Sequence, residues 1–130
     1  MMDYLGILLA AIAGFASGSI WYMVNGARWL EATGRTEEEI KADKSPLPFI
    51  IAFLASLLTA AMMRHILVSS GISGIVEGVV SGLGIGLFMI APWILTNYAF
   101  AARPRALWWI DAGHVVLAAT AIGAVLGLFL

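Results

Sequence analysis

Asp111 and His114 are the residues of this sequence whose types and spacing could do chemistry, and both lie in an apolar stretch. A helix would place them on one face, because they are three positions apart. From position 106 the chain reads Ala-Leu-Trp-Trp-Ile-Asp-Ala-Gly-His, which begins a segment long and apolar enough for a bilayer. A charged group at the centre of a membrane costs about 3 kcal/mol in insertion measurements, so each residue is a candidate functional group.

Two interpretations of this pair remain open. In the first, the carboxylate and the imidazole belong to a small water-accessible pocket that binds or relays a proton or a cationic ligand. In the second, both groups are structural, because polar side chains inside a membrane also hold helices together. His114 would then be a neutral imidazole bonded across the bundle, and Asp111 would be held by one of four neighbours: Arg103, Arg28, Asn97 or Tyr22.

The composition predicts the elements that must position these residues. Of the 130 residues, 62% are hydrophobic and 12% are charged, whereas a soluble domain has about 25% charged residues. Apolar runs that exceed the roughly 20 residues needed to cross a bilayer predict one integral membrane domain over residues 1–130, an all-α protein with a compact bundle of four transmembrane helices. We expect these helices at about 4–33, 48–68, 75–100 and 106–130. Within the connection 34–47, Thr36 and Glu39 have the spacing of a capping box, which predicts a short surface helix.

The basic residues predict the orientation. The first and third loops hold six of the seven Lys and Arg residues, and the second loop region holds only Arg64. By the positive-inside rule the basic loops lie in the cytoplasm and both termini lie outside. The protein is therefore expected in the cell's inner, cytoplasmic membrane.

Small residues recur at every fourth position in each predicted helix, which predicts close small-xxx-small packing between helices. In the third helix the row is Gly78, Gly82 and Gly86, and in the fourth it is Ala119, Gly123 and Gly127. Gly82 to Gly86 superficially resembles a dinucleotide-binding loop, but the strand that such a loop must follow is absent. Pro92 should kink the third helix.

Further polar and aromatic residues collect at the predicted cytoplasmic end. Tyr22, Asn25 and Asn97 join Asp111 and His114 as candidates for binding a ligand or proton. At the opposite end, a second polar cluster is expected, with a salt bridge between the ends of the second and third helices; its members are Arg64, His65 and Glu77. The chain has no cysteine, and we expect no metal site and no cofactor.

Three classes of function remain open. One is a small carrier that uses the inner polar pocket, and another is a non-catalytic accessory or structural subunit of a larger membrane complex. An enzyme is the third and least favoured, because no nucleophile–base pair accompanies Asp111 and His114. The expected partners are the lipid bilayer and either a second copy or a larger membrane complex. A net charge of −1 gives no basic patch for nucleic acid.

Four features along the chain carry a resemblance to a known family. Gly18 with Trp21 and Tyr22, later Trp29 and Gly34, then a glycine-rich third helix, and finally Ile110-Asp111-Ala112-Gly113 resemble the prokaryotic membrane family named domain of unknown function 1761. The resemblance spans nearly the whole chain. It implies four transmembrane helices and no known activity. Members often have an aromatic residue and then a histidine after Asp-Ala-Gly, whereas here His114 follows directly.

Overall fold

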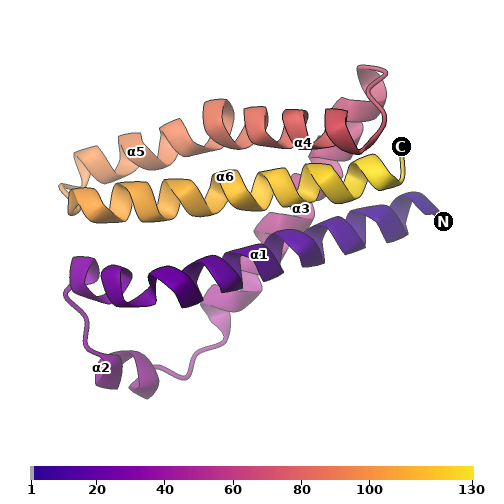
Figure 1. Cartoon of the computed structure of the whole chain (residues 1–130). Helices are drawn as coiled ribbons and strands as arrows, with labels where there is room; N and C mark the ends of the chain where they lie inside the picture. The colour runs from indigo at the N-terminus through magenta and orange to yellow at the C-terminus, as the bar shows by residue number, and fades with distance from the viewer. Residues whose placement is uncertain (1) are drawn as a thin grey trace.

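The computed structural model describes residues 2–130, in which helices are joined by short loops (Figure 1). Four spans are long and apolar enough to cross a membrane. Three of them are single helices: α1 (Met2–Thr33), α3 (Leu47–Ser69) and α6 (Arg105–Leu128). The remaining span consists of α4 (Ile75–Gly84), the π-helix η1 (Ile85–Ile90) and α5 (Ala91–Phe100). The chain is thus a multi-pass membrane protein with the predicted all-α bundle fold.

The loop after α1 has the predicted surface helix. α1 ends at Thr33, and the following Gly34 has a φ of 72°, which suits a residue without a Cβ. The helix α2 (Glu37–Ala42) follows, and the Thr36 side chain accepts a hydrogen bond from the backbone N–H of Glu39 at 3.2 Å. Thr36 therefore satisfies one of the unpaired donors that begin every helix.

The break that Pro92 was expected to cause takes the form of a π-helix. Pro92 is near the start of α5, directly after η1. Proline has no N–H, and its ring clashes with the carbonyl oxygen four residues earlier, so a regular α-helix cannot continue through it. A π-turn adds one residue to the turn and relieves this conflict. The turn also rotates every later side chain relative to an unbroken α-helix.

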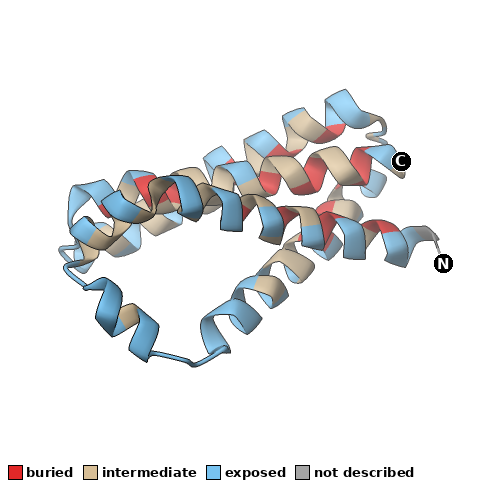
Figure 2. Cartoon of the chain, turned by 60° about the horizontal axis from the view of Figure 1, so that its bottom comes forward, coloured by how far each residue is buried: buried red, intermediate tan, exposed pale blue. Residues whose placement is uncertain are grey.

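α6 lies between α1 and the α4–α5 span, and it contacts all the other long helices (Figure 1). Besides the buried residues Ala91, Leu107, Ile110 and Ala112, the bundle has a core cluster in one half (Figure 2). It is formed by the early part of α1, the late part of α3 and the late part of α6, through Ala10, Ala11, Ala60, Met63, Leu67, Ala119, Ile122 and Leu126. Toward α2, α3 diverges from α1 (Figure 2). α1 and α3 are therefore closely packed at one end of the bundle and separate at the other.

Backbone meets backbone where α4 faces α6. A Cβ added to Gly78 would collide with the carbonyl oxygen of Gly123, and one added to Gly82 would collide with that of Ala119. Such an approach is open only to glycine at these positions, and it is one way helices associate where lipid removes the hydrophobic driving force.

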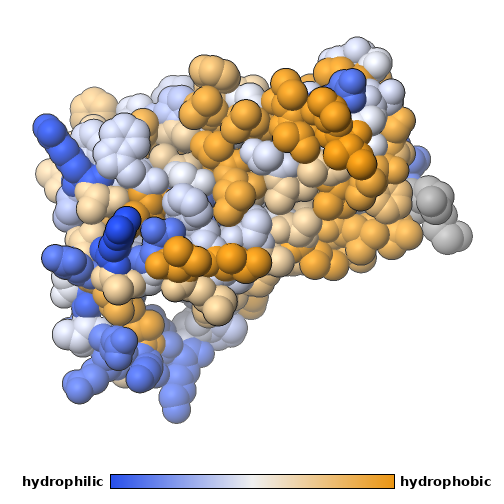
Figure 3. All heavy atoms as spheres, viewed as in Figure 1, coloured by the Kyte–Doolittle hydropathy of each residue, from blue (hydrophilic) through white to orange (hydrophobic). Residues whose placement is uncertain are grey.

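Polar side chains gather at the end of the molecule where α2 lies, and apolar side chains cover much of the rest of the visible face (Figure 3). This polar end has the end of α1, α2 and the turn between α5 and α6, which carry the six basic residues of the predicted cytoplasmic loops. The orientation itself stays a prediction.

Candidate functional site

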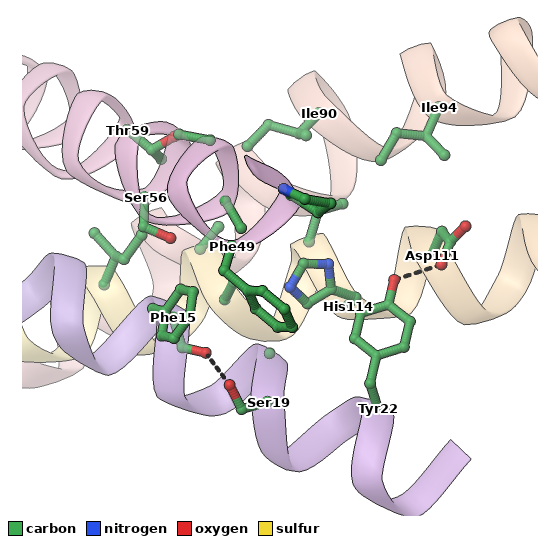
Figure 4. A pocket seen from close by; sticks show the side chains of 18 of the residues that line it. Phe15, Ser19, Tyr22, Phe49, Ser56, Thr59, Ile90, Ile94, Asp111 and His114 are labelled. Atoms are coloured by element: carbon green, nitrogen blue, oxygen red, sulfur yellow. Dashed lines mark hydrogen bonds between the residues drawn. The ribbon is translucent and has the colours of Figure 1, made fainter. Parts of the chain in front are cut away.

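The carboxylate of Asp111 is held by two tyrosine hydroxyls from two other helices. Tyr22 in α1 donates a hydrogen bond to Oδ1, and Tyr98 in α5 donates one to Oδ2 at 2.5 Å. Figure 4 shows Tyr22 reaching from α1 to Asp111 on α6. The carboxyl group is half-buried. Asp111 therefore joins α1, α5 and α6 at a single point.

The residues around this point fit together as two complementary sequence elements. Trp21 of α1 donates its indole N–H to the backbone carbonyl of Ile110 at 2.8 Å. Its ring lies over Gly113, where a Cβ would stand 2.6 Å from Cζ2 of the indole. The three residues Gly18, Trp21 and Tyr22 of α1 thus contact the segment 110–114 of α6.

His114 lies beside this contact and points into a cavity (Figure 4). Its ring centroid is 5.0 Å from that of Tyr22, and the two rings are tilted by 56°. On the other side, the imidazole lies close to Gly18. Asp111 and His114 share the cavity wall, as their spacing predicted, but within residues 2–130 no third metal-ligating residue joins them.

The cavity has a volume of about 890 Å³, within the range of small-molecule sites. Its wall comes from α1, α3, η1, α5 and α6. Most of the lining is apolar, and the polar side chains are few: Ser19, Tyr22, Ser56, Thr59, Tyr98, Asp111 and His114. It opens where α3 diverges from α1 and extends to Ala119 and Ile122 of the core cluster.

Of the other predicted site residues, Tyr22 lines the cavity and Asn25 and Asn97 do not. Tyr22 is in the site, but Asn25 donates to the backbone oxygen of Trp21 in its own helix and does not line the cavity. Asn97 is exposed and does not line it either, whereas its neighbour Tyr98 does. At 3.6 residues per turn, Asn97 would share the face of Gly86 in an unbroken helix. Because η1 adds one residue to the turn, Tyr98 lies on this face instead of Asn97. Tyr98 was not among the predicted site residues.

The predicted cluster at the other end is not brought together. The expected salt bridge between Arg64 and Glu77 is wrong, because Arg64 pairs instead with Asp3 at 2.6 Å. Arg64 follows Met63 and lies one turn after Ala60, both buried on the face of α3 that packs against α1, so its side chain reaches the start of α1. His65 and Glu77 are exposed.

Comparison with known proteins gives one match. A family model described as "Protein of unknown function (DUF1761)" matches residues 5–127. No curated protein and no solved structure matches the chain. The matched range includes both complementary elements of the site, the segment from Gly18 to Tyr22 and the segment from Ile110 to His114.

Proposed function

Because the chain belongs to the family described as protein of unknown function DUF1761, we propose a function from the site itself: the protein binds a small cationic ligand in the cavity beside Asp111. One observation carries this proposal. The half-buried carboxylate lies on the wall of a cavity of about 890 Å³, and its hydrogen bonds come from neutral hydroxyls. Within residues 2–130 no cationic side chain forms a salt bridge with it.

The electrostatics favour a cation at this position. Each carboxylate oxygen has more than one acceptor site, so a hydroxyl donor on each leaves room for a further donor from the ligand. An ammonium group would complete the site by a charge-assisted hydrogen bond, which is stronger than a neutral one. The attraction is also larger here than in water, because the surrounding medium has a lower dielectric constant.

The size and lining of the cavity favour ligand binding over a proton relay or an enzyme. A proton relay needs a chain of polar groups and no large apolar space, so the volume favours a ligand over a proton alone. We propose binding without catalysis, because among the described residues of the wall no serine or threonine hydroxyl is hydrogen-bonded to His114 or Asp111 as a nucleophile would be to its base. The hydroxyl of Ser19, for example, donates to the backbone oxygen of Phe15.

The setting of the site is part of the proposal. We place the protein in the cytoplasmic membrane, with the cavity at the cytoplasmic side, because the basic residues concentrate at that end. We propose that it acts as a homo-oligomer or within a larger membrane complex, since a single bundle of this size leaves little room for a pathway. The mass of the natively purified protein tests this part.

Binding of hexylamine and of hexanol to the protein in phosphatidylcholine nanodiscs tests the proposed function. We expect at least a tenfold preference for the amine, because only the amine carries a charge. The isosteric variant Asp111→Asn should lose this preference, and Glu77→Gln, which removes an exposed charge elsewhere, should keep it. Equal binding of the two probes to the native protein would show that Asp111 is not a counter-charge for a ligand.

A further inference from the structure

We infer that the ligand is an amphiphile, an amine with a single hydrocarbon chain that enters the cavity from the bilayer between α1 and α3. This inference rests on the proposed function and adds the class of the ligand and its route. It is carried by three features of the structure: the apolar extension of the cavity, a second apolar cavity beside it, and an apolar mouth.

The cavity extends far beyond the polar group at Asp111. The lining of α6 continues through Val115 and Ala118 to Ile122, eleven positions after Asp111 and so about 16 Å along the helix. Opposite this wall lie apolar residues of α1 and α3, including Phe15 and Ala52. An ammonium group at Asp111 would use one end of this space, and only an apolar group suits the rest.

A second cavity of about 370 Å³ lies next to the first. Thr59 and Ile90 line both cavities, so a shift of these two side chains would join them. The other residues of the second cavity are apolar: Leu58, Met62, Met63, Ile66, Ile85 and Met89. Methionine side chains adapt to irregular apolar shapes. The two spaces together suit an extended chain, with the amine at one end and the methionines at the other.

The π-helix contributes three of the residues that line the second cavity. Ile85, Met89 and Ile90 all belong to η1. Residues 85 and 89 would share a face in an α-helix as well, and the widened turn adds residue 90 to this face; it also brings Tyr98 to Asp111. The π-helix in the third span therefore shapes both the site at Asp111, where the amine would bind, and the second cavity, where the end of the hydrocarbon chain would lie.

The mouth of the cavity is apolar. Met23 of α1 and Phe49 of α3 line the cavity and are 82% and 67% exposed, respectively. Phe49 is in the first turn of α3, which places it near the membrane interface on the side of α2. Within the described lining, Asp111 is the only Asp, Glu, Lys or Arg. A ligand that arrived from water would meet no charged group at the entrance, whereas an amphiphile could slide in from the hydrocarbon layer.

Charge complementarity selects the head group. A fatty acid would bring a second carboxylate next to Asp111, and like charges at close range repel. A neutral alcohol would leave the carboxylate without a counter-charge. The single carboxylate and the apolar remainder of the wall therefore favour a lipophilic amine over the other single-chain amphiphiles.

Photo-crosslinking tests the inference, with a dodecylamine that carries a diazirine at the chain end. The protein is held in phosphatidylcholine nanodiscs, and the matching dodecanol probe is the control. We expect the amine to label the buried or half-buried lining residues Thr59, Met63 and Ile90 at least fivefold more than the alcohol does. A diazirine in the middle of the chain should move the label to the level of Ser56 and Ile122.

Two variants of α3 form a matched pair for the same experiment. Ala55 lines the cavity, Ala61 does not, and both are exposed on the surface of the helix. Ala55→Trp should reduce chain-end labelling at least fivefold because the indole fills the space, and Ala61→Trp should leave it unchanged.

The outcomes separate the inference from the function on which it rests. If amine and alcohol probes label alike and Asp111→Asn changes nothing, the proposed cation binding is wrong. If labelling depends on the amine and on Asp111 but the chain end marks lipid-facing residues such as Phe88, the ligand class proposed here is wrong. The same conclusion follows if Ala55→Trp and Ala61→Trp have equal effects.

Discussion

The imidazole of His114 lies so close to Gly18 that a Cβ at position 18 would stand 2.5 Å from its Nε2 atom. α1 therefore carries a glycine at the point where α6 presents a histidine. Together with Trp21 on Gly113 and Tyr22 on Asp111, this contact fixes the register of the two helices. The position of the imidazole in the cavity thus depends on the absence of a side chain at residue 18.

Gly18→Ala should move His114 and weaken the binding of hexylamine, with a smaller effect on stability because a side-chain end can shift. Gly26 is the matched control, since it is in the same helix and a Cβ there would meet nothing within 4 Å. Gly26→Ala should be neutral or should stabilise the helix by up to about 1 kcal/mol. Titration of both variants in nanodiscs checks the prediction, and equal affinities would contradict it.

Tyr22→Phe should lower the free energy of unfolding by about 1 kcal/mol, because it removes one donor to the Asp111 carboxylate. The ring contacts of Tyr22 with His114 and Trp29 would remain. Tyr4→Phe is the control, since Tyr4 is 79% exposed. Unfolding in mixed micelles measures the free energy of unfolding of both variants. A decrease of equal size in the two would mean that the hydroxyl of Tyr22 does not stabilise the fold.

Gly82→Ala should destabilise the bundle by about 1–3 kcal/mol, because the methyl group meets the backbone of α6 and neither helix can yield locally. Gly84→Ala in the same helix places its methyl group in open space and should cost nothing. The melting temperatures of the two variants in detergent give the comparison. A harmless Gly82→Ala would rule out the close approach of α4 and α6.

Much of this fold follows from the sequence, because membrane spans are set by length and hydropathy alone. The predicted spans agree with α1, α3, the α4–α5 span and α6 to within two residues at most ends. The capping residue Thr36 likewise predicts α2, since the cap is a local interaction. The pairing of Asp111 with Tyr22 was among the alternatives that the sequence left open.

The features that the sequence could not predict depend on how far each helix is rotated about its axis and on which helix lies next to it. Pro92 signals a break in the helix but not its form, and the π-helix decides whether Asn97 or Tyr98 faces Asp111. The partner of Arg64 depends on which neighbour the polar side of α3 meets, and Asp3 is 61 positions away. The cavity depends on the divergence of α3, which no local pattern encodes.

Single cysteines at Ser70 and Lys41 should react from opposite sides of the membrane, and the native chain has no cysteine to interfere. Ser70→Cys should react with an impermeant maleimide in intact cells. Lys41→Cys should react only after permeabilisation, because the positive-inside rule predicts that the basic loops lie in the cytoplasm. Labelling of Lys41→Cys in intact cells would place the cavity on the outer side.

The most direct test of the account is complementation of a deletion strain by Asp111→Asn at matched expression. The substitution keeps the shape of the side chain and removes its charge, so we predict that the variant folds with a melting temperature close to the native value. It should nevertheless fail to restore the growth or uptake phenotype, whereas Glu77→Gln restores it. Full complementation by Asp111→Asn would contradict the claim that the protein uses this carboxylate to bind a cation, and would leave Asp111 as a structural link between three helices.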